Sequence, residues 1–199
     1  MRRSIGSALL TPFLLALLAG TAAAQPADTV QLRRELERIA ADHRGVVGIS
    51  MRNLSNGESL SIRGDEPFPS ASLIKVAILV TLLDEVHHGR MSLDERVSLI
   101  ARDRVGGSGV LYRLGSGLQP TLEDLAWLMI TLSDNTATNL LLDKLDIATV
   151  GEKMEALGLH RSKVHSKTFR RETSIAPDSS AKYGFGVTTP DETTALFTM

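Results

Sequence analysis

An apolar run at residues 76–83 (VAILVTLL) is the feature that most limits what this chain can fold into. The run leads into HHG at 87–89, and histidine and glycine are typical of helix carboxyl ends. The pattern therefore predicts a buried helix over residues 72–86. A single charge, Lys75, interrupts the otherwise nearly apolar stretch SASLIKVAILV at 70–80. Removing an ammonium group from water is costly, so this lysine needs a chemical reason to be there.

A helix and a hairpin are predicted before this buried helix. The segment TVQLRRELERIAADHR follows Asp28, a typical N-cap, and Gly45 lies beyond its end. Its apolar residues fall near one face of a helix: Val30, Leu32, Leu36, Ile39 and Ala40. Apolar and polar residues then alternate over 46–54 and 58–63, on either side of the Asn56-Gly57 pair. That pattern predicts a β-hairpin.

The remaining segments are mainly helices and loops. Residues 104–119 are rich in glycine and indicate a loop, and a capping-box pattern at Thr121 starts a helix over 122–132. The next predicted segments are helices over 136–145 and 150–158 and a long polar loop over 159–187. This order of elements predicts an α+β (mixed) fold that is short of strands.

Composition narrows the classes of function. The chain has 199 residues, 43% of them hydrophobic, which suits one domain with a substantial core. A net charge of −1 gives no reason to expect nucleic acid or an acidic membrane surface as a partner. The chain has no cysteine for a disulfide or a thiolate metal site. Its five histidines show no HxxxH or HxH spacing, so we expect no catalytic metal.

Residues 1–24 have the pattern of a secretory signal peptide. A positive RR pair at 2–3 precedes the apolar segment LLTPFLLALLAG at 9–20, and AAA at 22–24 offers a cleavage site. The apolar segment is shorter than the roughly 20 residues that span a bilayer, so cleavage is favoured over retention as an anchor. We therefore expect a secreted or periplasmic domain of residues 25–199, with no stable membrane insertion and no cysteine to carry a lipid.

Ser72 and Lys75 are three residues apart, so their side chains lie on one face of the predicted helix. At the amino end of a helix, the dipole favours negative charge developing on a serine oxygen. A desolvated lysine beside that serine would act as a base, or would stay charged and orient the hydroxyl. The alternative for so short a motif is a chance match, in which Lys75 extends to solvent.

A second polar motif, Ser133-Asp134-Asn135, closes the helix predicted over 122–132. These residue types are natural helix caps, so a simple helix-to-helix junction is one interpretation. The same junction can also deliver a hydroxyl and an amide to a neighbouring cleft. Both interpretations can hold together.

Three segments resemble the class A serine β-lactamases and their penicillin-binding relatives: SASLIKVAILV, GSGVL at 107–111, and LMITLSDNTATNLLLDKL. The resemblance covers residues 28–199, and the distance from Ser72 to Ser133 is also similar to the family's. It implies the β-lactamase/D,D-peptidase-like fold, in which an all-helical subdomain packs beside an antiparallel sheet. No cofactor is implied.

The resemblance also implies roles for the site residues. Ser72 would be the acylated nucleophile, Lys75 would take part in its activation, and Ser133 would pass a proton to the leaving nitrogen. Asn135 would bind the side-chain amide of the substrate, and the backbone N–H of Ser72 would supply half of an oxyanion hole. Tyr112 and the glycine-rich loop before it would border the cleft.

The base for deacylation is a first departure from the family. Class A enzymes carry a glutamate in an Ω-shaped loop near an asparagine, and the corresponding segment 159–187 has only Glu172. The family's usual spacing from Ser133 falls nearer Phe169, and no E-x-x-x-N pattern is present. Glu172 is therefore either a shifted equivalent of the base or a solvated charge beside two arginines.

A second departure is the absence of the family's Lys-Thr-Gly strand after Ser133. A strong helix start at Thr189 leads to Met199 with no C-cap. A hairpin with nothing else to pair with is marginal in water. We therefore expect a catalytic domain that is incomplete at its C-terminus, with its last strands missing and with little activity in this chain alone.

Three functions remain open at the level of sequence. The first is a serine β-lactamase that opens the β-lactam ring through an acyl-enzyme on Ser72. The second is a penicillin-binding, D,D-peptidase-like or esterase-like enzyme with slow deacylation, and the third is an inert binding module with this fold. In each case we expect a small-molecule partner, either a β-lactam or a peptidoglycan-like acyl-D-Ala-D-Ala, and a monomeric protein.

Overall fold

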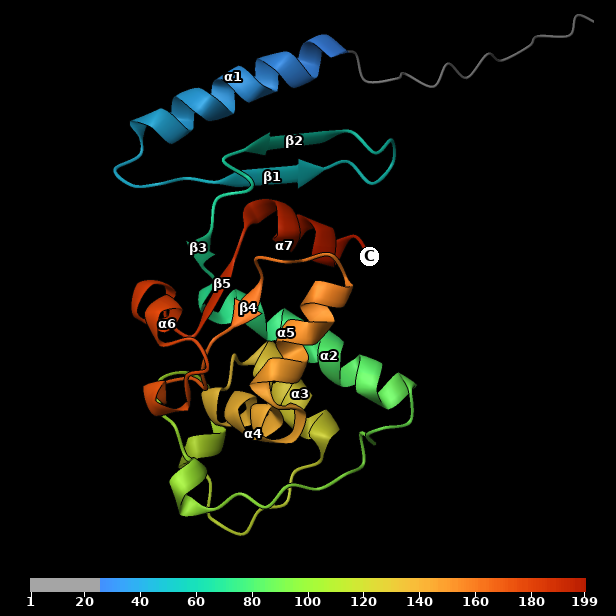
Figure 1. Cartoon of the computed structure of the whole chain (residues 1–199), viewed down its shortest axis with the longest axis vertical. Coiled ribbons are helices and arrows are strands. Elements are labelled where there is room, and N and C mark those ends of the chain that lie inside the picture. Colours follow the sequence, from blue (N-terminus) through green and yellow to red (C-terminus); the bar gives the residue numbers. More distant parts are fainter. Residues whose placement is uncertain (1–25) are drawn as a thin grey trace, which may run out of the picture.

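The computed structural model describes residues 26–199 and shows a mixed helix-and-sheet fold (Figure 1). The signal peptide predicted for residues 1–24 lies outside the described residues. The helices are α1 Pro26–Asp42, α2 Lys75–His87, α3 Leu122–Thr131, α4 Asn135–Leu145, α5 Ile147–Ala156, α6 Pro177–Tyr183 and α7 Pro190–Phe197. The strands are β1 Ile49–Arg52, β2 Ser59–Ile62, β3 Phe68–Pro69, β4 Lys163–Val164 and β5 Gly186–Thr188. Four 3-10 turns are η1 Ala71–Ile74, η2 Ala101–Asp103, η3 Leu111–Arg113 and η4 Arg171–Thr173.

The helix α2 is the centre of the hydrophobic core, as its apolar sequence predicts. Ile78 and Leu82 on this helix are fully buried, and α2 contacts α3, α4 and α5. Facing side chains include Leu125 of α3, Leu141 of α4 and Val150 of α5, all without solvent exposure. Burial of such side chains is the main stabilising term of the helical part. The packing of α2 against α3, α4 and α5 therefore holds the start of α2 in a fixed position.

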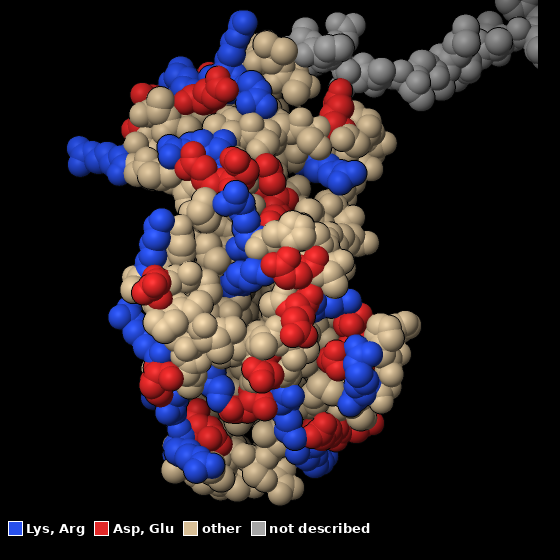
Figure 2. Space-filling view, in the orientation of Figure 1, with Lys and Arg blue, Asp and Glu red and all other residues tan. Residues whose placement is uncertain are grey.

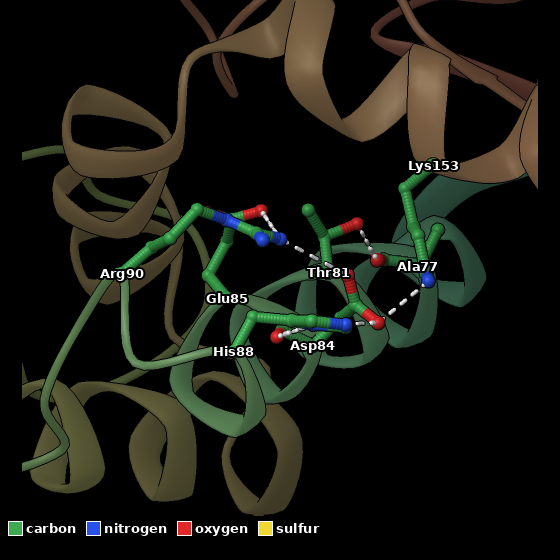
Figure 3. A network of polar contacts seen from close by, with 7 residues as sticks. All are labelled: Ala77, Thr81, Asp84, Glu85, His88, Arg90 and Lys153. Atoms are coloured by element: carbon green, nitrogen blue, oxygen red, sulfur yellow. Dashed lines mark hydrogen bonds and ion pairs between the residues drawn. The ribbon is translucent and has the colours of Figure 1, made fainter.

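An ion-pair network joins the end of α2 to α5 (Figure 3). Lys153 Nζ on α5 donates to Asp84 Oδ1 on α2 at 2.7 Å, and Arg90 Nη2 lies 3.5 Å from Asp84 Oδ2. Arg90 also binds both carboxylate oxygens of Glu85, at 2.7 and 2.8 Å. The hydrogen bond from Lys153, followed by the charges of Lys153, His88 and Arg90, holds the pKa of Asp84 below its usual value. Because the groups are near the surface, each pair adds little stability alone.

The predicted hairpin is confirmed. Strands β1 and β2 pair antiparallel with Ile49 opposite Ile62, and Gly57 in the turn has a φ of 77°. Helix α7 contacts β1 and α1 contacts β2, so the hairpin lies between two helices (Figure 1). Within residues 26–199 no third strand joins this sheet.

Helix α1 forms where predicted, although it starts at Pro26 rather than just after Asp28. Its apolar face is largely exposed in the described part of the chain: Val30, Leu32 and Ile39 keep more than a third of their surface in solvent. The reason is that α1 packs on a hairpin of only two short strands.

The prediction of a long polar loop over 159–187 is wrong. This segment contributes β4, η4, α6 and the start of β5, and β5 lies between β3 and β4 in a three-stranded antiparallel sheet. Pro69 pairs with Val187, and Lys163 pairs with the same valine from the other side. Strands of two or three residues are too short to show an alternating pattern, so only long-range pairing reveals them.

Two predicted helix starts are confirmed. Thr121 caps α3, and its Oγ1 accepts from the N–H of Asp124 while the Asp124 carboxylate accepts from the N–H of Thr121. Thr189 caps α7 in a similar way through the N–H of Glu192. A capping hydroxyl of this kind is worth about 1 kcal/mol.

The surface carries both signs of charge. Figure 2 shows lysine and arginine interspersed with aspartate and glutamate over this face, in keeping with the net charge of −1. Among residues 26–199, no helix has the length and apolar character to cross a bilayer. In the same range, no group of three or more acidic, histidine or cysteine side chains is placed to hold a metal ion.

Candidate active site

Ser72 lies in the 3-10 turn η1, directly before α2, and is exposed. The sequence predicted that Ser72 opens the helix; the structure instead places it inside a tighter turn that continues into α2 at Lys75. Ala71, just before it, has a φ of 45°, in the left-handed region that residues with a side chain rarely adopt. Strained backbone of this kind is common where a side chain must be presented to a ligand.

Lys75 is buried, with 2% of its surface exposed. Its Nζ donates to the backbone oxygen of Ser133 at 2.7 Å, to Ser133 Oγ at 3.0 Å and to Asn135 Oδ1 at 3.0 Å. Three acceptors match the three hydrogens of an ammonium group, so the buried charge is fully hydrogen-bonded. The side chain therefore points into the interior toward the second motif and does not extend to solvent.

Burial lowers the pKa of Lys75 from 10.5 to about 8. The dominant cause is desolvation, which disfavours the charged form, while the nearby carboxylate of Asp134 acts in the opposite direction. An amine with a pKa near neutrality exists partly as the free base. Lys75 can therefore exchange a proton under ordinary conditions.

Ser133 connects the nucleophile candidate to the lysine. Its Oγ donates to Ser72 Oγ at 2.9 Å and accepts from Lys75 Nζ at 3.0 Å. Among the hydrogen bonds of residues 26–199, none joins Lys75 Nζ to Ser72 Oγ; the two residues share only a backbone contact, from the N–H of Lys75 to the carbonyl oxygen of Ser72. Ser133 has a φ of 53°, so its backbone too is held in the left-handed region. The contact that the Ser72–Lys75 spacing suggested is thus made through a second hydroxyl.

Asp134 fixes the position of the second motif. Its carboxylate is fully buried and caps α4 through the N–H of Ala137 at 3.0 Å. The other carboxylate oxygen accepts from the N–H groups of Val110 and Leu111, at 2.7 and 2.8 Å. Gly109 has a φ of 97°, and a Cβ there would come within 2.2 Å of the Asp134 carboxyl carbon. One carboxylate therefore ties the glycine-rich loop to the start of α4.

Asn135 forms one side of the site. Its Oδ1 accepts from Lys75, its Nδ2 donates to the backbone oxygen of Gly106 at 3.0 Å, and its N–H donates to Ser108 at 3.1 Å. Tyr112 lies close to this loop, with its ring 4.0 Å from where a Cβ on Gly106 would be. Tyr112 is therefore a neighbour of the site through the loop, and no hydrogen bond joins it to Asn135 among the described residues.

Glu172 lies apart from this cluster. It is in the turn η4, its side chain is 69% exposed, and its nearest charged partner is Arg170, at 3.9 Å. It lines a surface cavity of about 280 Å³ together with Arg102 and Lys167. Within residues 26–199, no hydrogen bond or ion pair links Glu172 to Ser72 or its partners. The structure thus brings together Ser72, Lys75, Ser133 and Asn135, but not Glu172.

Asn139 is a structural residue of the site that sequence reasoning missed. It is buried one turn after Asn135 on α4, and its side chain binds both backbone groups of Thr168, at 2.8 and 3.0 Å. This pair of hydrogen bonds fixes the backbone just before Phe169. Phe169 in turn lies beside Gly107 and Asn135. A polar residue inside a helix gives no sequence signal for such a contact.

The fold and the serine–lysine–serine cluster together define the class of serine β-lactamases and penicillin-binding proteins. The chain belongs to the beta-lactamase enzyme family Beta-lactamase2, whose sequence profile matches residues 31–199. It is 30% identical over 139 residues to Beta-lactamase L2 of Stenotrophomonas maltophilia, an alignment covering 69% of this chain and 46% of that protein.

Solved structures agree with this assignment. A β-lactamase from Sphaerobacter thermophilus DSM 20745 superposes with a TM-score of 0.71 and 33% identity, covering 82% of this chain and 59% of that one. The protein named PBP-A superposes with a TM-score of 0.72 and 30% identity, covering 83% and 59%. A leucine-to-glutamate variant of PBP-A was solved as an acyl-enzyme complex with penicillin G. The chain spans about half the length of the curated relative described above.

Proposed function

We propose that the protein is a serine hydrolase that opens the β-lactam ring through an acyl-enzyme on Ser72. The observation that carries the proposal is the unbroken hydrogen-bonded chain from Ser72 Oγ through Ser133 Oγ to Lys75 Nζ. A nucleophile, a proton relay and a base of suitable pKa are the parts that acyl transfer requires.

The geometry supports a specific sequence of proton transfers. When Lys75 is neutral, the two hydroxyl hydrogens can turn so that Ser72 donates to Ser133 and Ser133 donates to Lys75. As Ser72 Oγ then bonds to the carbonyl carbon of the ring, its proton passes to Ser133 Oγ, and the proton of Ser133 passes to Lys75. When the ring C–N bond breaks, Ser133 returns a proton to the leaving nitrogen and Lys75 replenishes it. The backbone N–H of Ser72 would stabilise the oxyanion, and Asn135 would bind the side-chain amide of the substrate. Water then releases the acyl group from Ser72.

A second candidate function is a penicillin-binding, D,D-peptidase-like enzyme whose acyl-enzyme hydrolyses slowly. The exposed position of Glu172, paired with Arg170 and separate from Ser72, favours it. The usual family spacing would put the deacylating glutamate near position 169, where Phe169 has no group that can accept a proton. A variant of the similar protein PBP-A forms an acyl-enzyme with penicillin G, which supports acylation as the shared first step.

The cellular setting forms part of the same proposal. Residues 1–24 would direct export and be removed, leaving a catalytic domain that starts at residue 25 in the periplasm or outside the cell. We propose that the domain is monomeric and that its substrate is a β-lactam or a peptidoglycan-like acyl-D-Ala-D-Ala. No cofactor takes part in the proposed steps.

Ser72→Ala in the full-length gene product tests the proposal. Wild-type protein should hydrolyse a chromogenic cephalosporin, or should at least gain the mass of one penicillin molecule, whereas Ser72→Ala should do neither. Ser55→Ala is the matched control, because Ser55 is an exposed serine in the hairpin. Steady turnover would support the hydrolase, a stoichiometric burst the slow-deacylating enzyme, and absence of any reaction in the wild type would leave only a binding module. Undiminished acylation of Ser72→Ala would refute the assignment of the nucleophile.

A further inference from the structure

Phe169 is an exposed aromatic residue in a strained backbone conformation. Its φ is 54°, a region in which a bulky side chain is a genuine outlier, and 76% of its surface is in solvent. Strain that persists in a native fold is a mark of functional sites. With so much of its surface exposed, Phe169 contributes little to the core, so packing does not explain why the strain is kept.

The backbone around Phe169 is held firmly. Asn139 binds both the N–H and the C=O of Thr168, at 2.8 and 3.0 Å, and its side chain is buried. On the other side, the guanidinium group of Arg170 donates to the backbone oxygen of Arg102. The neighbours on both sides are therefore anchored, so the backbone at Phe169 is held in place.

Phe169 faces the candidate active site. A Cβ placed on Gly107 would lie 2.9 Å from Phe169 Cε2 and 3.0 Å from Asn135 Nδ2, so the phenyl ring and the amide flank the same point. Gly107 itself has no side chain to fill that space and has a φ of 92°. The glycine thus leaves room for the aromatic ring at the rim of the site, next to the proposed amide-binding group.

We propose that Phe169 is a specificity-determining residue that forms an apolar wall for the acyl side chain of the substrate. This inference rests on the proposed function, in which Asn135 binds the amide that carries that side chain. A group beyond the amide then meets the phenyl ring, and aromatic pairs gain stability beyond the burial of their area. The protein therefore prefers β-lactams whose acyl group is aromatic or bulky and apolar over those that lack it.

The test compares two penicillins on the full-length gene product. Benzylpenicillin carries a phenylacetyl group, and 6-aminopenicillanic acid has the same ring system without one. Phe169→Gly should lower the second-order rate constant of acylation by benzylpenicillin about tenfold or more, as for other apolar pocket contacts, and should leave that of 6-aminopenicillanic acid unchanged. Phe169→Leu, which keeps an apolar side chain, should retain most of the preference.

A measurement of stability distinguishes a role of Phe169 in specificity from a role in holding the fold together. Glycine accepts a φ of 54° without strain, so Phe169→Gly should keep or raise the urea midpoint while the rate with benzylpenicillin falls. Equal effects on the two penicillins, or none on either, would overturn the inference and leave the proposed function intact. If neither penicillin acylates the wild type, the proposed function fails, and this inference fails with it.

Discussion

Ser133 Oγ donates a hydrogen bond to Ser72 Oγ at 2.9 Å, although 61 residues separate the two serines in the chain. The contact joins the 3-10 turn before α2 to the left-handed turn before α4. Because Ser133 Oγ also contacts Lys75, any proton that leaves Ser72 has a path to a buried amine. Acylation by this cluster therefore depends on how these two turns are held together.

Ser133→Ala should reduce acylation by a penicillin about 100-fold or more, because positioned acid–base groups contribute about 10²–10⁴ to rate. The variant removes the relay hydroxyl and keeps both Ser72 and Lys75. Stopped-flow measurement of the acylation rate, with Ser55→Ala as the control for loss of a hydroxyl, checks this. A rate within about threefold of wild type would show that Lys75 activates Ser72 without Ser133.

The acylation rate should rise with pH and level off above pH 8. Only the neutral amine of Lys75 can accept a proton, and its pKa is lowered to about 8, mainly by burial. The second-order acylation rate constant, measured from pH 6 to pH 9.5 with benzylpenicillin, reports this ionisation in the free enzyme. A flat profile across this range would argue that Lys75 stays charged and only orients the hydroxyls.

Stability should also depend on Lys75. Its pKa is about 8 in the fold against an ordinary value of 10.5, so between these values the unfolded chain binds more protons than the folded one. The free energy of unfolding should therefore increase as pH rises from about 8 to about 10.5. Urea titrations of wild type and of Lys75→Met, compared at each pH, isolate the effect. If the free energy of unfolding changes with pH in the same way in both proteins, the predicted contribution of Lys75 is refuted.

The sequence predicts the helical part of the fold well because its signals are local. The apolar run of α2, the capping box at Thr121 and the Thr189 cap each appear within a few residues. The sheet of β3, β5 and β4 is different, because its strands have only two or three residues and β3 pairs with β5 across more than 100 residues of chain, as Phe68 does with Thr188. No local period marks such strands.

The candidate active site shows the same difference between local sequence signals and long-range contacts. The two short motifs locate Ser72, Lys75, Ser133 and Asn135, which the structure places in one cluster. Spacing along a helix shows which face a side chain occupies but not which polar atoms meet, so the position of Ser133 between the serine and the lysine is a structural finding. The two hydrogen bonds between the Asn139 side chain and the backbone of Thr168, just before Phe169, also depend on tertiary packing, and no pattern in the sequence indicates them.

Asp134→Asn should destabilise the fold by about 2–3 kcal/mol, since hydrogen bonds to a buried charged group are worth about 1.5–3 kcal/mol each. The carboxylate accepts three backbone N–H groups, and an asparagine would turn an N–H₂ group toward one of those donors. Urea unfolding gives the free energy, and Asp178→Asn on the exposed surface of α6 is the control. Equal stability of the two variants would contradict a structural role for this carboxylate.

Glu172→Gln tests whether Glu172 is the base for deacylation. If Glu172 activates the deacylating water after a movement of its loop, the variant should keep the acylation burst and lose steady turnover, since only the second half-reaction needs that base. The exposed position of Glu172 leads us to expect the other result, an unchanged steady-state rate. Burst and steady-state phases with a chromogenic cephalosporin measure both steps, and Glu123→Gln, an exposed glutamate on α3, is the matched control. Loss of turnover in Glu172→Gln alone would show that the loop carries this carboxylate to Ser72 during the reaction.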